Sequence, residues 1–379
     1  MDTNHRGGPQ GFVRLLSNDE SGVTLVYPEY SGNRLYQTLG NLRMTPKAGL
    51  VFPDFDTGDV LYITGTTEIL AGKDAADLLA HTNLAVKIKV DAARFVSDGL
   101  AFRGREGERS PYNPPVRFLS SEKHLGVVKN ENKVKAKLVS KKIITPTIAR
   151  FRFEIADPKK TKWKPGQYVA LSFADELDIG YSHMRDDDPK SLNDDFLRTF
   201  TVSSLPVDPD HFEVTLRKNG PVTHLLFRHN TRSELEVPLQ GFGGEFFIQQ
   251  KEGEKVSFIA GGVGITPLLA QAQDLDLKCL QFYWTLRGED LAFALDTFAL
   301  IPGLAESTKL FITGKINEKS EAWKQIATSG ATIEKRRLEK DDVVGDTADR
   351  WYMCAGPSLK SSVLEWMGGK TVTHEDFNY

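Results

Sequence analysis

The sequence predicts a multidomain β plus α/β protein, with a small partial β-barrel first, an antiparallel β-barrel second and a parallel-sheet α/β domain last. Three observations predict it. Short alternating strands separated by turn residues run to about residue 250, a charged stretch with several prolines lies near residue 110, and apolar strands alternate with helical stretches from residue 255 onward. A chain of 379 residues is long enough for two or three domains.

The first region, residues 1–115, is predicted to be mainly β. Its apolar runs lie at 23–27, 48–52, 60–69 and 84–90. Leucines at three- and four-residue spacing predict a short amphipathic helix within residues 33–43. A strand at 12–16 comes so early that little chain precedes it as a partner, so we expect an incomplete first domain. Residues 103–115, with charges, glycines and three prolines, are the predicted linker.

The later regions differ in their strand pattern. Residues 130–250 hold two alternating segments between 133 and 155, followed by short strands at 167–173, 199–203, 212–217 and 233–239. This spacing is typical of an antiparallel barrel. Residues 251–379 hold apolar strands at 256–260, 280–285, 309–313 and 350–355 with helical stretches between them. That alternation predicts a parallel sheet with crossover helices.

The composition is that of a soluble globular protein, with 40% hydrophobic and 26% charged residues. A formal net charge of −3 and a pI near 6.3 give no strong basic field, so we expect neither a nucleic-acid nor a membrane partner. We find no secretion signal and no membrane-length apolar run. Only Cys279 and Cys354 are present, too few for an iron–sulfur cluster, and free thiols favour a reducing cytoplasm.

The segment RTFTVSS, residues 198–204, places Arg198 and Phe200 on one face of a strand, because side chains alternate with a period of two. A flavin dinucleotide needs such a set: a cation for its pyrophosphate, a flat ring for the isoalloxazine and a hydrogen-bond partner near flavin N5. An ordinary alternating strand is the alternative interpretation.

Two glycine-containing turns are candidate phosphate sites. In GPVTHLLF, residues 220–227, Thr223 is predicted to cap a helix whose free N–H groups can bind phosphate; a capped helix without a ligand is the alternative. In VSFIAGGVGITPLL, residues 256–269, the glycines let the backbone approach a pyrophosphate. Pro267 stands there in place of the third glycine of the usual fingerprint, but suits a first helical turn after Thr266.

The last strand ends in WYMCAGPS, residues 351–358. Because carboxyl ends of parallel strands form the ligand crevice, Cys354 is expected to face that crevice; a cysteine that only packs is the alternative. Arg287, just after another strand, suits an adenosine ribose or its 2′-phosphate, or else a plain surface position, so NADH and NADPH both stay open.

Other polar patterns predict no metal site. The aspartates at 186–188, 194 and 195 lack the glycine and glutamate spacing of a calcium loop, and a solvated loop is the simpler interpretation. The eight histidines show no HExxH spacing, and no GxSxG elbow occurs.

In this order, the motifs of residues 130–379 resemble the ferredoxin-NADP reductase superfamily, over about two thirds of the chain. The resemblance implies a Greek-key FAD-binding barrel at 130–250 and an NAD(P)-binding α/β domain at 251–379. It implies an NAD(P)H-dependent FAD oxidoreductase that transfers a hydride from NAD(P)H to FAD and passes electrons to an acceptor, small molecule or redox protein, that the sequence does not name. A flavin-binding scaffold or accessory protein without a working nicotinamide site is the alternative.

The resemblance also implies roles for single residues. Arg198 would bind the pyrophosphate, Phe200 would stack on the isoalloxazine and Thr201 would lie near N5. Ala355 interrupts the family's Cys-Gly-Pro element. The implied FAD ligands are Arg198, Phe200, Thr201, Val202, Ser203, Gly220, Val222 and Thr223. The implied NAD(P)H ligands are Gly261, Gly262, Gly264, Thr266, Pro267, Arg287, Cys354, Gly356 and Pro357. Thr201, Cys354 and a terminal aromatic over the flavin, Phe377 first and Tyr379 second, are the implied catalytic residues.

Residues 27–54, with Ser31, Asn33, Arg34 and the segment PKAGLVF, resemble part of the pyridoxamine 5′-phosphate oxidase-like split barrel, which often holds FMN. The resemblance puts Arg34 near a phosphate contact. A strand missing before residue 12 would leave an unpaired edge and weaken an FMN pocket, so a remnant or accessory domain is the alternative. Such barrels often dimerise through the flavin site, which leaves a homodimer and a monomer both open.

Overall fold

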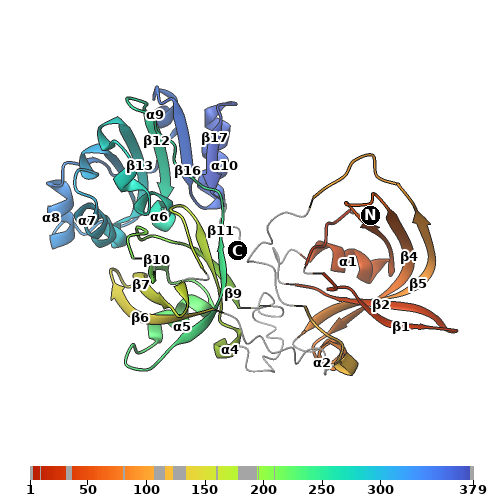
Figure 1. Cartoon of the computed structure of the whole chain (residues 1–379). Helices are drawn as coiled ribbons and strands as arrows, with labels where there is room; N and C mark the ends of the chain where they lie inside the picture. The colour runs from red at the N-terminus through yellow and green to blue at the C-terminus, as the bar shows by residue number, and fades with distance from the viewer. Residues whose placement is uncertain are drawn as a thin grey trace. The chain divides into compact units, whose positions relative to one another are not determined.

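A computed structural model describes residues 3–8, 10–30, 36–79, 82–105, 116–122, 134–158, 161–177, 194, 196–208 and 210–375 (Figure 1). The chain divides into two compact units, Met1–Asn132 with Ala174–Leu197 and Lys133–Phe173 with Arg198–Tyr379. The second unit contains both later predicted domains, whose boundary near residue 250 stays a prediction, as does the linker. Across the described ranges, no helix combines the length and the apolar character that a membrane span requires.

The first unit is built on an antiparallel sheet in the order β1-β2-β5-β4-β3, which confirms its predicted β character. Its elements are β1 (Arg14–Asp19), β2 (Gly22–Pro28), α1 (Gln37–Met44), β3 (Lys47–Pro53), β4 (Val60–Ala71), α2 (Lys73–Leu78), β5 (Leu84–Val96) and η1 (Ser120–Glu122). The predicted helix is α1, which buries Leu39 and Leu42. The short helix α2 has no counterpart in the sequence prediction.

The strand β1 corrects one expectation, because it does have a partner. It pairs antiparallel with β2, and Asp19 lies opposite Gly22. The Asp19 carboxylate accepts the Ser21 backbone N–H at 2.8 Å, which holds the tight turn between the two strands. The partner of this early strand therefore follows it in the chain, and β1 ends the sheet, so the missing strand and the open edge expected there stay a prediction.

An antiparallel barrel opens the second unit (Figure 1). The strands β10, β7, β6, β11 and β8 are antiparallel neighbours in that order, and β9 ends the sheet. The elements are β6 (Lys135–Ile143), β7 (Ile148–Ile155), β8 (Tyr168–Ser172), β9 (Leu197–Thr201), β10 (His211–Arg217), α5 (Pro221–Arg228) and β11 (Glu236–Gly243). The short helix α4 (Ala174–Leu177) and the first residue of β9 belong to the first unit. A bridge between Val202 and Val214 links the residue after β9 to β10 and so joins the two ends of the sheet. The predicted barrel is confirmed.

A parallel sheet in the order β15-β14-β13-β12-β16-β17 follows, as predicted. Its elements are β12 (Val256–Gly261), η4 (Gly262–Ile265), α6 (Thr266–Leu269), η5 (Ala272–Asp274), η6 (Leu277–Cys279), β13 (Leu280–Arg287), η7 (Gly288–Asp290), α7 (Leu291–Leu300), η8 (Ala305–Ser307), β14 (Thr308–Thr313), α8 (Glu321–Ala327), β15 (Thr332–Glu334), α9 (Lys340–Val344), β16 (Arg350–Cys354), α10 (Pro357–Met367) and β17 (Val372–Glu375). The strand order reverses at β12, and open α/β sheets bind ligands at the carboxyl ends of strands beside such a reversal.

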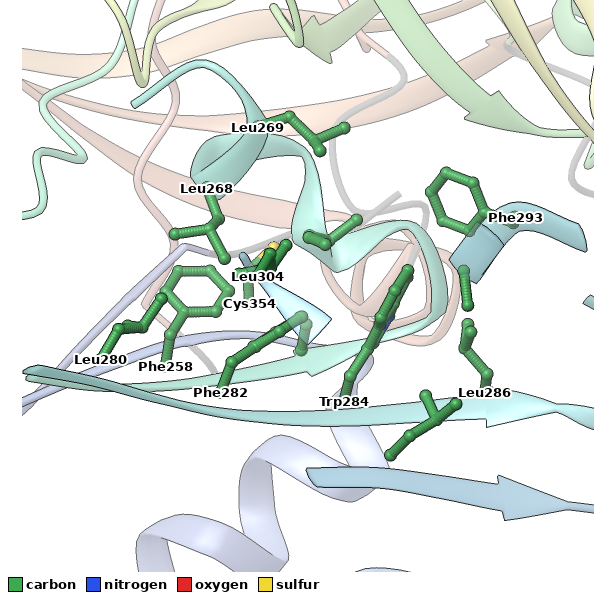
Figure 2. Packing of buried hydrophobic residues seen from close by; sticks show 14 of the residues in the cluster. Phe258, Leu268, Leu269, Leu280, Phe282, Trp284, Leu286, Phe293, Leu304 and Cys354 are labelled. Atoms are coloured by element: carbon green, nitrogen blue, oxygen red, sulfur yellow. The ribbon is translucent and has the colours of Figure 1, made fainter. Parts of the chain in front are cut away.

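An aromatic core covers one face of the parallel sheet (Figure 2). Phe258, Phe282 and Trp284 are fully buried, and the ring centroids of Phe282 and Trp284 lie 5.4 Å apart. Leu268 from α6 packs on the same cluster, which also includes Ile148 from β7. The core is therefore continuous from the sheet into the barrel, and burial of apolar surface holds these two parts of the second unit together.

The carboxylate of Asp342 ties three segments at the edge of the parallel sheet. It accepts hydrogen bonds from Lys309 Nζ at 2.7 Å, from Arg336 Nη1 at 2.6 Å and from the Glu339 backbone N–H at 3.0 Å. The Arg336 guanidinium, then Lys309, holds the pKa of Asp342 well below its ordinary value of 3.8, although burial opposes this shift. Asp342 therefore stays ionised in the folded protein down to low pH.

We expect Asp342→Asn to lower the free energy of unfolding at pH 7 by about 1.5–3 kcal/mol, the range for hydrogen bonds to a charged group. Because the folded pKa is lowered, the stabilisation is complete above the ordinary pKa near 3.8 and is lost as pH falls below it. Urea unfolding at several pH values should show the two proteins converging in acid. Glu252→Gln, an exposed change, is the control, and a loss that stays constant from pH 7 to pH 3 would contradict this account.

Candidate functional site

The strand β9 presents two predicted flavin ligands on one half-exposed face. Arg198 and Phe200 are half-buried, whereas Thr199 and Thr201 point to the interior. This alternation is the one that the sequence pattern predicts for a strand. A cation and a flat ring thus lie on the same side of β9, two residues apart, which is the arrangement that a pyrophosphate and a stacked ring system need.

The hydroxyl of Thr201 is buried without a hydrogen-bond partner among the described residues, and the Thr199 hydroxyl is in the same condition. A buried hydroxyl left unpaired costs about 1–3 kcal/mol, so a bound group that offers a donor or an acceptor is favoured beside it. Thr201 ends the strand that carries Arg198 and Phe200. The strand therefore offers FAD the half-exposed Arg198 and Phe200, whereas the Thr201 hydroxyl lies on the opposite, interior face, and its contact near N5 stays a prediction.

The next two residues are occupied within the barrel. The backbone N–H of Val202 donates to the Gln167 carbonyl at 3.0 Å, and that of Ser203 donates to the Glu213 carbonyl at 2.8 Å. The Ser203 hydroxyl also lies 2.9 Å from Thr215 Oγ1. Both side chains are buried, and the cofactor contacts that the resemblance implies for Val202 and Ser203 stay predictions.

The helix α5 begins one turn earlier than its predicted cap. Gly220, with φ +80°, precedes Pro221, and a Cβ placed on Gly220 would meet nothing within 4 Å, so the backbone there is open. Thr223 is inside the helix, where its hydroxyl accepts the Asn219 N–H at 2.6 Å and donates to the Asn219 carbonyl at 2.7 Å. The predicted capping by Thr223 is therefore wrong. The first-turn N–H groups, that of Val222 among them, are what α5 offers a phosphate.

The strand β12 runs into the glycine turn as predicted, but the helix after it is short, because η4 precedes the single turn of α6. Gly262 has φ +57°, a left-handed conformation that glycine adopts without strain. Gly261 and Gly262 are half-exposed, whereas Gly264, Thr266 and Pro267 are buried. The first two glycines therefore form the part of the turn that a pyrophosphate can approach.

The glycine turn and Cys354 meet, but the thiol is closed off. A Cβ on Gly264 would lie 2.0 Å from the Cys354 carbonyl oxygen, so only glycine permits this contact. Cys354 has no exposed surface and belongs to the aromatic core (Figure 2). Burial raises the pKa of its thiol well above the ordinary value of 9.0. The expectation that Cys354 faces an open crevice is therefore corrected, because the Gly264 backbone packs over its strand end.

Sequence reasoning missed Glu375, the last residue of β17. Glu375 lies opposite Cys354 in register, and its charge adds to the burial that raises the pKa of the thiol. The sequence did offer a signal for Glu375, because this acidic residue lies two positions before the predicted aromatic Phe377. Gly356 and Pro357, which begin α10, are exposed, and a Cβ on Gly356 would meet nothing within 4 Å.

A basic pocket of about 580 Å³ lies at the carboxyl ends of β13 and β14. Five basic side chains and one acidic side chain, Glu289, line it; the basic ones are Arg287, Lys315, Lys335, Arg336 and Arg337. The Arg336 guanidinium forms ion pairs with Asp342 and Glu334. Arg287 forms an ion pair with Glu289 at 3.4 Å. Within the described ranges, Lys315 and Arg337 carry no ion pair. Only Arg287 was predicted here, because the other four come from two loops that the fold brings together.

Several predicted residues lie outside the described residues. These are Ser31, Asn33 and Arg34 of the first unit, the aspartates at 186–188 and 195, and the terminal aromatics Phe377 and Tyr379. The FMN contact at Arg34 and the aromatic over the flavin therefore stay predictions.

Known proteins resemble parts of the chain. The glycine betaine monooxygenase reductase subunit of Pseudomonas aeruginosa is 33% identical over 136 residues, 35% of this chain and 32% of that protein. A second relative is the ferredoxin–NAD(P)⁺ reductase component of the naphthalene 1,2-dioxygenase system of Pseudomonas putida. It is 26% identical over 236 residues, which are 60% of this chain and 62% of that protein. The chain thus spans about a third of the first relative. No protein-family model matches the chain.

Among solved structures, the FAD/NAD-binding domain of a nitric oxide dioxygenase from Vibrio cholerae is similar to the chain with a TM-score of 0.46 and 15% identity. The match covers 65% of this chain and 98% of that domain.

We expect Gly264→Ala to destabilise the second unit or to displace the end of β16, because the added Cβ would overlap the Cys354 carbonyl. Overpacking of this kind costs about 1–3 kcal/mol, so the melting temperature should fall. Gly345→Ala is the matched control, since Gly345 has φ −77° and open space at its Cβ position. Equal melting temperatures for the two variants would contradict this packing.

Proposed function

We propose that this chain is a flavoprotein oxidoreductase that takes electrons from NAD(P)H and delivers them to a separate acceptor. Bound FAD supplies the redox chemistry, since it takes a hydride from NAD(P)H and releases the electrons onward. The observation that carries the proposal is that one compact unit holds both a strand that exposes Arg198 and Phe200 and a glycine turn at the reversal point of a parallel sheet.

In the barrel, the guanidinium of Arg198 neutralises the FAD pyrophosphate and Phe200 stacks on the flavin ring. The Thr201 hydroxyl, which is buried without a partner among the described residues, gives or accepts a hydrogen bond at the ring. The open backbone at Gly220 and the first-turn N–H groups of α5 support the phosphates. These groups orient the flavin and exclude water from one side of it.

In the parallel sheet, the backbone at Gly261 and Gly262 receives the pyrophosphate of the nicotinamide dinucleotide. The basic pocket then lies one strand away, at the carboxyl ends of β13 and β14. An excess of basic over acidic side chains suits the 2′-phosphate of NADPH, and arginines bind phosphate in a bidentate manner. We therefore infer that NADPH is preferred over NADH.

The acceptor lies outside these 379 residues. Two cysteines cannot supply the four thiolates that usually hold an iron–sulfur cluster. The relatives are named as reductase parts of monooxygenase and dioxygenase systems, which supports a redox protein as the acceptor. A cytoplasmic location suits the two free thiols.

We expect the purified chain to carry FAD that NADPH reduces under anaerobic conditions. The released flavin should have the mass of FAD, and added NADPH should bleach its absorbance with a lower half-saturating concentration than NADH. Flavin that neither nucleotide bleaches would support a scaffold without a working nicotinamide site. A colourless folded protein that does not take up FAD would reject the proposal.

We expect Arg337→Ala to lower kcat/KM for NADPH about tenfold and to leave the value for NADH within about twofold, because the lost contact is to the 2′-phosphate. Steady-state reduction of ferricyanide with each nucleotide measures both values. Lys278→Ala, an exposed cation outside the pocket, is the control. An equal loss with NADH and NADPH would show that the pocket does not read the 2′-phosphate.

A further inference from the structure

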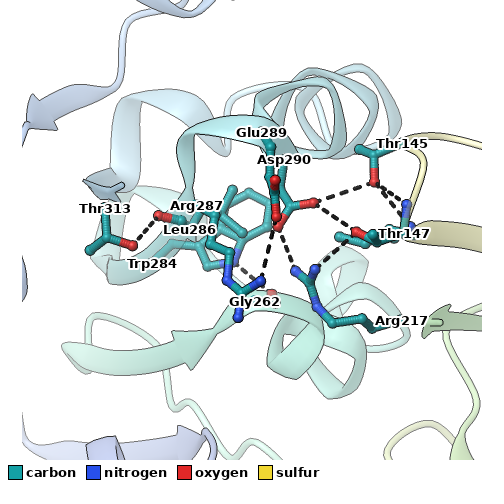
Figure 3. Close-up of polar contacts among 11 residues, drawn as sticks. Thr145, Thr147, Arg217, Gly262, Trp284, Leu286, Arg287, Glu289, Asp290 and Thr313 are labelled. Atoms are coloured by element: carbon teal, nitrogen blue, oxygen red, sulfur yellow. Dashed lines mark hydrogen bonds and ion pairs between the residues drawn. The ribbon is translucent and has the colours of Figure 1, made fainter. Parts of the chain in front are cut away.

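A buried polar tie joins the barrel to the parallel sheet beside the glycine turn (Figure 3). The carboxylate of Asp290 is fully buried and accepts a hydrogen bond from Arg217 Nη2 at 2.5 Å. Arg217 also donates from Nη1 to Thr147 Oγ1 at 3.0 Å, and the Thr145 hydroxyl donates to Asp290 at 3.3 Å. A buried carboxylate is stable only with partners of this kind, so the tie fixes β10 to the start of α7.

Arg217 is linked to three segments of the candidate site, through the chain, through space and through its partner Asp290. Along the chain it precedes Gly220, at the start of α5, by three residues. In space its Nη2 lies 3.6 Å from the position that a Cβ on Gly262 would take, so the guanidinium lies beside the glycine turn. Its partner Asp290 follows Arg287, which lines the basic pocket, by three residues. A displacement of the Arg217 guanidinium would therefore shift both the glycine turn and the segment that carries Arg287.

We propose that Arg217 is a positioning residue for hydride transfer, which acts through Asp290 and the glycine turn to set the approach of nicotinamide to flavin. The inference rests on the proposed function. The reacting atoms must come within about 3–3.5 Å, and a displacement of about 1 Å can cost on the order of 100-fold in rate. Because the Asp290 carboxylate neutralises Arg217, its charge adds little attraction for a nucleotide phosphate, and its contribution is to geometry.

A second ion pair between the same two parts of the unit is a matched control. Arg150 Nη2 donates to Asp296 Oδ2 at 2.8 Å, and Lys142 Nζ donates to Asp296 Oδ1 at 2.5 Å. Asp296 lies within α7, six residues after Asp290. Loss of Arg150 leaves Asp296 with Lys142, so the carboxylate keeps one cationic partner. This pair therefore reports on the attachment of barrel to sheet without the contact to Gly262.

The experiment compares Arg217→Met and Arg217→Lys with Arg150→Met, each as the full chain loaded with FAD. The double variant Arg217→Met/Asp290→Asn leaves no buried charge unpaired and guards against a failure to fold. Stopped-flow absorbance follows anaerobic flavin reduction over a range of NADPH concentrations. We expect the limiting rate to fall about 10- to 100-fold in Arg217→Met and in the double variant, while the half-saturating NADPH concentration stays within about threefold.

Arg217→Lys should recover part of the rate, and Arg150→Met should lower the melting temperature without lowering the limiting rate. An equal loss of rate in Arg150→Met would overturn the proposal, because attachment alone would then explain it. A rise in the half-saturating concentration with an unchanged limiting rate would also overturn it. The unaltered chain distinguishes failure of the proposed function from failure of this inference. If NADPH does not reduce the flavin of the unaltered chain, the proposed function fails and this inference fails with it. If NADPH does reduce it and only the variants behave otherwise than expected, this inference alone fails.

Discussion

Two carboxylates hold the parallel sheet against the barrel. Asp290, just before α7, binds Arg217 of β10, and Asp296, within α7, binds Arg150 of β7 and Lys142 of β6. Charges withdrawn from water to this degree are tolerated only when they are paired, so each part of the unit completes the other. The shared aromatic core supplies non-directional attraction, whereas hydrogen bonds to fixed carboxylates require one alignment. The position of the glycine turn depends on the Arg217–Asp290 pair, because Arg217 also lies beside Gly262.

The same alignment leaves some groups open and closes others. Arg198 and Phe200 stay half-exposed on β9, and the Thr201 hydroxyl is buried without a partner in the described part of the chain. Cys354 is enclosed because the Gly264 backbone lies over the end of its strand. A buried protonated thiol is neither a nucleophile nor an acid near neutral pH. Its contribution to the site is therefore its volume, which shapes the floor beneath the glycine turn.

The strand pattern, the barrel and the parallel sheet could be predicted from the sequence because alternation and apolar runs are local properties of the chain. The same is true of the common face of Arg198 and Phe200. Contacts between distant segments could not be predicted. The enclosure of Cys354 depends on Gly264, 90 residues earlier, and the hydroxyl of Thr223 turns back to Asn219 only because the helix starts at Pro221. The loops that line the basic pocket likewise meet only in the folded sheet.

The pairing of β6 with β11 affects how the protein is made. Gly243, which ends β11, lies 108 residues after Lys135, which begins β6. At roughly 5–20 residues per second, a ribosome needs on the order of 5–20 s to complete the barrel after β6 has been synthesised. Until then β6 lacks the neighbour that β11 provides in the folded barrel, and an unpaired strand edge favours pairing with other chains. The strand order itself therefore favours shielding of the nascent chain until β11 emerges.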